Sequence, residues 1–194
     1  NQTKRRMNLY LKTLAGLEPL ATEELKSAGA TSIVPGRRGI SFEGDSKVLY
    51  SICMHSRFSV RVLRHLTSFE AATPDDLYRN GARFAWENIL APDGTFVIDA
   101  TVNSDGFSHS HFAALKLKDA IVDRFRGKTG QRPSIDKVRP DLRLNLHIAG
   151  DKVTLSVDAS GDQLSRRGYR PRTAKAPLNE VLAASNLDPV MLGN

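Results

Sequence analysis

SHSHFAALKLKDAIVDRFRGK, residues Ser108–Lys128, is the most informative stretch of this 194-residue sequence. Its apolar residues recur at the spacing of an amphipathic α-helix. Ser108 is expected to cap the helix through its hydroxyl. Gly127 and Gly130 are expected to end it, because glycine tolerates the left-handed conformation found at helix ends. The predicted core side of the helix comprises Ala114, Leu115, Leu117, Ile121, Val122 and Phe125.

Basic residues gather at the end of the predicted helix and continue past it. Cations in a last helical turn interact favourably with the helix dipole, which accounts for the first of them. The run then continues to residue 143, further than a helix end requires, and we interpret it as a contact surface for RNA phosphates. Lys118 falls within the apolar arc and is expected at the edge of the core instead. The predicted contact residues here are Lys116, Arg124, Arg126, Lys128, Arg132, Lys137, Arg139 and Arg143.

The chain is strongly basic, with a formal net charge of +7 and a sequence pI of about 9.8. Such an excess of cations favours a polyanionic partner, most often nucleic acid, although charge alone leaves open a solvated basic surface. Aromatic residues make up 7% of the chain, which argues against a platform that stacks single-stranded bases. Cys53 is the single cysteine, so the sequence predicts neither a disulfide nor a cysteine-rich metal site, and a reducing cytoplasm fits. No apolar run approaches the length of a membrane span.

The sequence up to residue 71 predicts a compact ferredoxin-like unit with the order β-α-β-β-α-β. Ile40 and Phe42 alternate with polar neighbours, which is typical of a strand. Leu20 is expected on the core side of the first helix, and Asp45 or Ser46 is expected to cap the second. The predicted elements are a strand over 8–14, a helix over 17–28, strands over 31–34 and 38–43, a helix to about 56 and a strand over 58–66.

A second α/β unit is predicted over residues 72–160. Thr73 and the following Pro-Asp-Asp form a strong helix start, and this helix is expected to run to about Leu90 with Trp86 in the core. Strands are predicted over 95–102 and 134–138, and the alternation in 142–148 and 153–157 predicts a hairpin. The fold class is therefore α+β, with domains over 1–71 and 72–160 and a connector over 161–194.

The histidines near the start of the central helix raise two alternatives that we reject. His109 and His111 form a His-x-His pair, but no third ligand has suitable spacing, so we predict no metal site. Ser108 beside His109 lacks a placed acid and an oxyanion hole, so we predict no catalytic residue. Ser108 and Ser110, with the backbone N–H groups of the helix start, are instead expected to donate hydrogen bonds to phosphate.

Several segments together resemble one family, the bacterial THUMP-domain RNA methyltransferases, and most closely the large-subunit ribosomal RNA guanine-N2 methyltransferases. The resemblance covers nearly the whole chain. Its most specific part is RRGYR followed by APLNEVLAA, within residues 166–184. The segments that carry the resemblance are Leu14–Glu18, His109–Ile121, Pro140–Leu142, Val157–Asp158, Leu164–Arg170 and Ala176–Ala184.

The resemblance implies a ferredoxin-like domain packed on a THUMP domain, which grips structured RNA and presents it to a Rossmann-like domain. In the family, that catalytic domain uses S-adenosylmethionine to methylate N2 of guanine. It begins shortly after the APLNE segment, whereas here five residues follow Asp188-Pro189, the tail over 186–194 departs from the family, and no Gly-x-Gly-x-x-Gly occurs. We therefore expect no catalytic or cofactor-binding residue in this sequence, and residues 161–194 to lead toward a methyltransferase domain. The connector adds four residues to the predicted RNA contacts, Arg166, Arg167, Arg170 and Arg172.

Two other functions remain open at this point. The chain could be a stand-alone RNA-binding adaptor, or the THUMP module of a tRNA-modifying enzyme such as a thiouridine synthetase. The APLNE segment favours the ribosomal RNA methyltransferase. In each case the expected partner is structured RNA, without a metal or a membrane.

Overall fold

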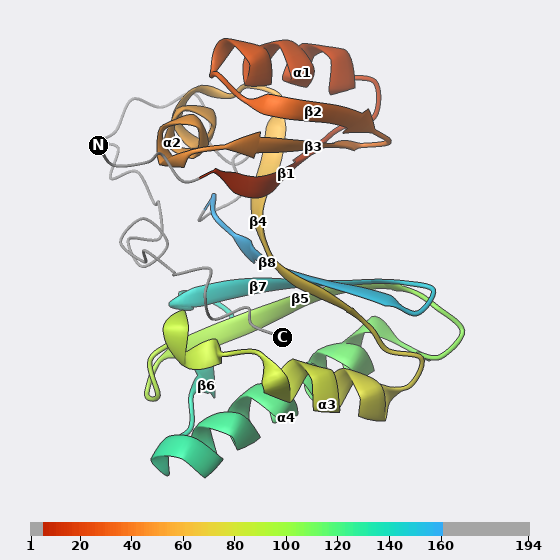
Figure 1. Ribbon diagram of the computed structural model, residues 1–194, viewed down its shortest axis with the longest axis vertical. Coiled ribbons are helices and arrows are strands. Elements are labelled where there is room, and N and C mark those ends of the chain that lie inside the picture. Colours follow the sequence, from red (N-terminus) through yellow and green to blue (C-terminus); the bar gives the residue numbers. More distant parts are fainter. Residues whose placement is uncertain (1–5, 161–194) are drawn as a thin grey trace. The chain divides into compact units, whose positions relative to one another are not determined.

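The computed structural model describes residues 6–160 of the chain, which divide into two compact units. The first unit contains the described residues up to His65 and a short returning segment that begins at Asp158. The second unit runs from Leu66 to Val157. The strands of both units belong to one eight-stranded sheet, and each unit contributes its own group of neighbouring strands and two α-helices (Figure 1).

The first unit has the predicted order β-α-β-β-α-β. Its strands lie in the order β2-β3-β1-β4, and all three neighbouring pairs are antiparallel. Strand β2 forms the edge, where the pairing register breaks between Thr31 and Val34 and Pro35 lies opposite Ile40. The elements are β1 (Met7–Thr13), α1 (Glu18–Ser27), β2 (Thr31–Gly36), β3 (Gly39–Gly44), α2 (Ser46–His55) and β4 (Ser59–Glu70), which continues into the second unit.

Both helices of the first unit pack on the sheet through short apolar stripes. Helix α2 begins as predicted at Asp45, whose carboxylate accepts hydrogen bonds from the backbone N–H groups of Lys47 and Val48, each 3.0 Å long. Helix α1 buries Ala21 and Leu25 completely, whereas Leu20 is 49% exposed. The prediction for Leu20 was therefore wrong, because the narrow apolar stripe of α1 leaves this neighbouring position outside the core.

The second unit has a mixed sheet with two helices on one face (Figure 1). Strand β5 is parallel to both β6 and β7, and β7 forms an antiparallel hairpin with β8. The sheet order is β8-β7-β5-β6, and the last part of β4 lies beside β8. The elements are α3 (Pro74–Arg83), the 3-10 helix η1 (Trp86–Asn88), β5 (Thr95–Asn103), α4 (Ser110–Thr129), β6 (Ser134–Ile135), β7 (Leu142–Ala149) and β8 (Lys152–Asp158).

Helix α3 starts as predicted but ends earlier than the sequence indicated. The hydroxyl of Thr73 and the carboxylate of Asp76 form a capping box at its start. The helix ends at Arg83 and not near Leu90, because its last carbonyl groups are taken by side chains. The indole Nε1 of Trp86 donates to the carbonyl of Gly81 at 2.7 Å, and Trp86 itself is fully buried.

Helix α4 begins one residue later than predicted. Ser108 does not cap it: His109 is the N-cap residue, in extended conformation and without a side-chain cap. Phe107 is buried, and the chain must extend from this anchor to reach the helix. The helix passes through Gly127 and ends at Gly130, whose φ of 71° is the left-handed conformation that was expected.

The buried face of α4 also differs slightly from the prediction. Ala113 is buried where Ala114 was expected, and Leu115 is 40% exposed. Lys118 is half-buried, as predicted, with its ammonium group 3.0 Å from Asp119. The predicted strand over 134–138 is limited to two residues, because the carboxylate of Asp136 turns the chain immediately afterwards. The buried residues of α4 are Ala113, Leu117, Ala120, Ile121, Val122 and Phe125.

Candidate nucleic-acid interface

The structure divides the predicted basic residues of the second unit into paired and unpaired groups. Five of them have carboxylate partners within the protein. Three of these pairs are single contacts, formed by Lys116 with Asp75 at 3.7 Å, Arg126 with Asp123 at 3.4 Å and Arg143 with Asp99 at 3.4 Å. Arg124 and Lys128, the other two, share the carboxylate of Glu87.

Glu87 is the centre of the strongest ion-pair cluster among the described residues. Arg124 donates to both of its oxygens at 2.8 Å, and Lys128 donates to one of them at 2.5 Å. The hydrogen bonds from Arg124, and next those from Lys128, lower the pKa of Glu87 to about 2. The Arg124 side chain is only 16% exposed and also donates to the carbonyl of Ala82 at 2.8 Å. It therefore closes the end of α3 and is poorly placed to reach a large ligand.

The unpaired cations lie in the segment between α4 and β7, residues 130–141, which we call the basic loop. Arg132, Lys137 and Arg139 are all exposed, and within residues 6–160 none of them forms an ion pair. Asp136 gives this loop a defined shape, because its carboxylate accepts the N–H groups of Val138 at 2.8 Å and Arg139 at 3.0 Å. These backbone hydrogen bonds lower the pKa of Asp136 below its ordinary value.

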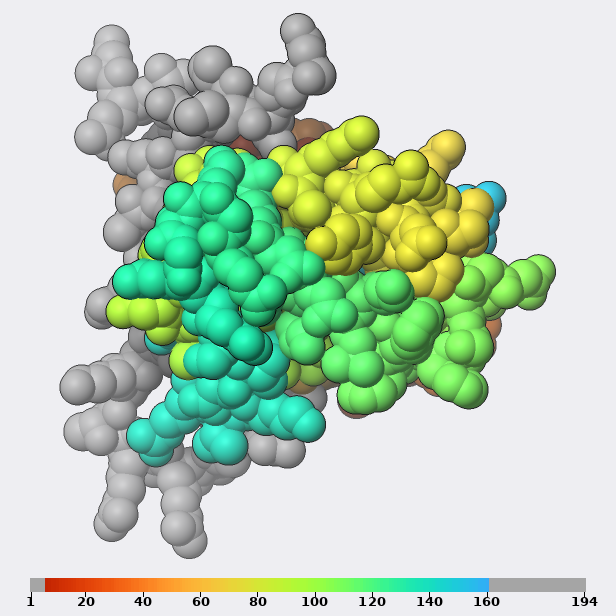
Figure 2. All heavy atoms as spheres, turned by 90° about the horizontal axis from the view of Figure 1, so that it is seen from below, coloured from red at the N-terminus to blue at the C-terminus, as the bar shows by residue number. Residues whose placement is uncertain are grey.

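The basic loop lies on the same surface as the two helices of the second unit. Figure 2 shows α3, α4 and the loop that follows α4 side by side on one face of the molecule. Ser108 and Ser110 are exposed at the opposite end of α4 from the loop, so they do not join it in one cluster. Four other predicted contacts, Arg166, Arg167, Arg170 and Arg172, lie outside the described residues.

Sequence reasoning missed the acidic residues that organise this surface. Glu87 lies within the predicted helix, next to Trp86, and Asp136 lies within a predicted strand, so neither position indicated a structural role. It also missed exposed apolar groups near the cations: Val138 in the basic loop is 81% exposed, and Phe112 of α4 lies under the ammonium group of Lys116, 5.9 Å from the ring centre. Such pairs of a cation with an apolar neighbour suit the phosphate and ribose of a nucleic-acid chain.

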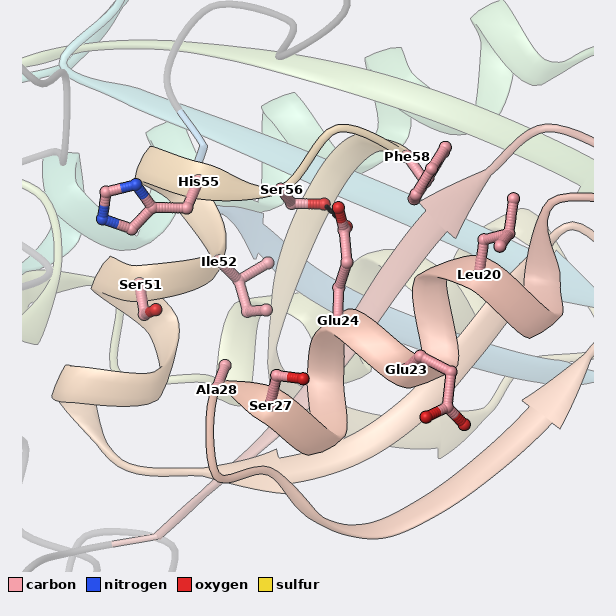
Figure 3. A pocket seen from close by; sticks show the side chains of 10 residues that line it. All are labelled: Leu20, Glu23, Glu24, Ser27, Ala28, Ser51, Ile52, His55, Ser56 and Phe58. Carbon is pink, nitrogen blue, oxygen red and sulfur yellow. Dashed lines mark hydrogen bonds between the residues drawn. The ribbon is translucent and has the colours of Figure 1, made fainter.

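A surface hollow of about 400 Å³ lies in the first unit between α1 and α2 (Figure 3). Glu24 points across it toward Ser56, and its carboxylate accepts the Ser56 hydroxyl at 2.5 Å and the backbone N–H of Arg57 at 2.9 Å. Leu20, Ile52 and Phe58 supply apolar walls. The Glu24 carboxylate is thus engaged in fixing the chain after α2 and does not stand free as an acid or base.

Two kinds of feature are absent from residues 6–160. No group of three or more His, Cys, Asp or Glu side chains within residues 6–160 is placed to hold a metal ion. No helix in that range combines the length and the apolar character that a membrane crossing requires.

Comparison with known families agrees with these two units. The profile described as an RlmL ferredoxin-like domain matches residues 8–63, and the profile described as a THUMP domain matches residues 71–158. The chain belongs to the THUMP-domain proteins. Its ferredoxin-like domain of the RlmL type precedes the THUMP domain, and both the resemblance and the α+β fold predicted from the sequence are confirmed.

Relatives of this THUMP protein are longer than the chain itself. The ribosomal RNA large subunit methyltransferase K/L of Syntrophotalea carbinolica is 49% identical over 172 residues, which are 89% of this chain and 24% of that protein. The chain spans about a quarter of the length of the first curated relatives it matches.

Solved structures share the fold of the two domains. A possible methylase from Clostridium difficile 630 has a TM-score of 0.73 and 26% identity, over 95% of this chain and 49% of that one. The protein SMU.472, solved in complex with SAH, has a TM-score of 0.72 over 99% of this chain and 50% of its own. At 22% identity the second likeness concerns the fold alone.

Proposed function

We propose that this chain is the RNA-binding region of an S-adenosylmethionine-dependent ribosomal RNA guanine-N2 methyltransferase. The observation that carries the RNA-binding part is the basic loop, in which Arg132, Lys137 and Arg139 are exposed, unpaired among the described residues and held in a defined turn by Asp136. Pre-formed cations of this kind bind phosphate without first breaking an internal ion pair. The THUMP match and the relation to ribosomal RNA methyltransferases support this assignment.

The chemistry of the surface favours folded RNA over a particular sequence. Long cationic side chains contact phosphates, and such contacts do not distinguish one base from another. A protein that recognises the shape of RNA in this way binds a structured duplex or hairpin in preference to a single strand. Arg126, Lys128, Lys116 and Arg143 remain proposed contacts, but each must release a carboxylate before it can bind a phosphate fully. Ser108, Ser110 and the connector arginines remain proposed contacts on the grounds given by the sequence.

The methyl transfer itself belongs to the proposed parent enzyme. The SAH in the SMU.472 structure fits a cofactor of this class in related proteins. The sequence printed here contains no glycine-rich cofactor loop, and we expect isothermal titration with S-adenosylmethionine to give no binding heat with this chain. One-to-one binding would contradict that part of the proposal. The cytoplasm, where bacterial ribosomal RNA resides, is the proposed location.

A salt titration tests the RNA-binding proposal directly. The affinity of the wild-type chain for a folded fragment of large-subunit ribosomal RNA should fall steeply with salt, because each neutralised phosphate releases counterions. The variant Arg132→Gln/Lys137→Gln/Arg139→Gln should bind more weakly, and the slope of log K against log salt should flatten by up to about three units.

A charge-matched control separates RNA binding at the basic loop from a general effect of the positive charge of the protein. The variant Lys26→Gln/Lys47→Gln/Lys152→Gln removes the same formal charge from exposed positions outside the basic loop. Its slope should stay close to that of the wild type. Equal effects of the two variants, or equal affinity of the wild type for an unstructured strand of the same length, would contradict the proposal.

A further inference from the structure

Three arginines at one end of the ferredoxin-like sheet share an unusual backbone arrangement. Arg37 and Arg38 form the two-residue turn between β2 and β3, and Arg57 follows α2 just before β4. All three side chains are exposed, and in the described part of the chain none of them forms an ion pair within 4 Å. We refer to Arg37, Arg38 and Arg57 as the arginine end.

Thr13, a buried residue at the end of β1, joins the two loops of the arginine end. Its backbone N–H donates to the carbonyl of Arg38 at 3.0 Å, and its hydroxyl donates to the carbonyl of Phe58 at 2.7 Å. Thr13 therefore holds two loops next to each other. Its backbone binds the turn that carries Arg37 and Arg38, and its side chain binds the loop that carries Arg57.

Two acidic residues of α1 also bind the backbone of these loops. Glu18 accepts the backbone N–H of Arg38 at 2.9 Å, and Glu24 accepts the backbone N–H of Arg57 at 2.9 Å. The second of these acids also binds Ser56, and Figure 3 shows its carboxylate reaching toward that residue. Each carboxylate thus accepts a hydrogen bond from the backbone of one of the two loops, so both loops have a defined conformation without a ligand.

The conformation of Arg38 is a further sign that its side chain is used. Its φ is 58°, in the left-handed region that glycine and asparagine adopt readily and residues with long side chains adopt rarely. A turn selected for stability alone would favour one of those two residues here. An arginine held in this conformation by Glu18 and Thr13 is explained if the guanidinium group contributes to binding.

We propose that the arginine end is a second phosphate-binding surface for the RNA, separate in sequence and in domain from the basic loop. Guanidinium groups can each bind two phosphate oxygens, and three of them on two pre-shaped loops suit successive phosphates of one RNA backbone. This inference rests on the proposed RNA-binding function and extends it to the ferredoxin-like domain. The RNA is then held by both domains, which raises affinity without sequence-specific contacts.

The test compares two double variants on the same folded ribosomal RNA fragment. Arg37→Gln/Arg57→Gln should raise Kd at least severalfold at low salt and flatten the salt slope by up to about two units. The matched control, Lys26→Gln/Lys47→Gln, removes the same charge from exposed helix positions near the end of α1 and the start of α2. Those positions belong to the opposite end of the sheet, since Gly44, just before α2, pairs with Met7 at the start of β1. The control should leave the slope unchanged.

A single variant separates binding from stability. Arg38→Gly removes the cation from a conformation that glycine prefers, so Tm should not fall while RNA affinity does. An unchanged affinity in both Arg37→Gln/Arg57→Gln and Arg38→Gly, with wild-type binding still steeply dependent on salt and sensitive to the basic-loop variant, would overturn this inference alone. Absence of any RNA binding by the wild type would overturn the proposed function together with it.

Discussion

Arg124 binds the carboxylate of Glu87 through two parallel hydrogen bonds, Nε to Oε2 and Nη2 to Oε1, each 2.8 Å long. The same guanidinium donates from Nη1 to the carbonyl of Ala82 at the end of α3. One side chain of α4 therefore fixes both the end of α3 and the short helix that follows. Arg124 was predicted to contact RNA, but in the structure it stabilises the packing of α3 and η1, which its sequence context did not indicate.

Removal of this carboxylate should weaken the second domain. We expect Glu87→Gln to lower the free energy of unfolding by about 1–2 kcal/mol, because the largely buried guanidinium of Arg124 loses its ionic partner and Lys128 loses the same partner. Urea denaturation of the two proteins measures the difference. Asp93→Asn, a change in an exposed turn acid, is the control and should have little effect. Equal stability of Glu87→Gln and wild type would show that the pair is neutral.

The same pair predicts how stability changes with acidity. The pKa of Glu87 is about 2 in the folded protein, well below the 4.5 that is ordinary for this residue. The unfolded chain therefore takes up the proton first, so the stabilisation is complete above about pH 5 and is lost as the pH falls from 4.5 toward 2. The stability difference between wild type and Glu87→Gln should shrink over that range. A constant difference down to pH 3 would contradict the prediction.

The indole of Trp86 offers a direct test of how α3 is ended. Trp86→Phe keeps an aromatic ring in the core but removes the Nε1–H that satisfies the buried carbonyl of Gly81. We expect a loss of about 1–3 kcal/mol, the usual effect of leaving a buried acceptor without its partner. Thermal denaturation followed by circular dichroism measures it. Because Phe84 packs edge-on against the same indole, Phe84→Leu reports the packing contribution separately.

A close approach between Tyr10 and Gly39 predicts a rescue experiment. A Cβ atom on Gly39 would lie 1.9 Å from the hydroxyl of Tyr10, whose ring covers this position from the neighbouring strand. Gly39→Ala should therefore destabilise the first domain by about 1–3 kcal/mol. In the Tyr10→Ser background the same alanine should cost much less, since the ring is gone. Additive effects in this double-mutant cycle would refute the steric explanation.

Asp136 allows the shape of the basic loop to be separated from its charge. Asp136→Asn and Asp136→Ala remove the same negative charge, but only asparagine retains an oxygen that can accept the N–H groups of Val138 and Arg139. If loop shape matters, the asparagine variant should bind folded RNA at least about twofold more tightly than the alanine variant, because less order is lost on binding. Fluorescence anisotropy with a labelled RNA fragment measures both. Identical affinities would mean that charge alone governs binding.

Local sequence signals predicted much of the fold. Alternating residues such as Ile40 and Phe42 are buried as expected, and the carboxylate of Asp45 and the capping box of Thr73 start their helices where predicted. These features succeed because their causes lie within a few residues of one another. The end of α3 failed as a prediction, because the groups that close it come from Trp86 and from Arg124 on another helix.

The candidate interface was harder to predict for a similar reason. A count of cations cannot tell which of them have internal partners: Arg124 and Lys128 meet Glu87 some forty residues away, whereas Arg132 meets no described carboxylate. The sequence indicated only an exposed turn at Arg37 and Arg38, because the left-handed conformation of Arg38 and its hydrogen bond to Glu18 become apparent only once the sheet is formed.

The irregular edge strand β2 has a consequence for the protein in solution. An open strand edge with a regular row of N–H and C=O groups is a template on which another chain can assemble into a growing sheet. Here Ser32 has a φ of 52°, the register breaks before Val34, and Pro35 supplies no N–H group. A second copy therefore finds no continuous ladder along this edge. The exposed side chain of Val34 can consequently be tolerated there without making β2 a nucleus for fibrous aggregation.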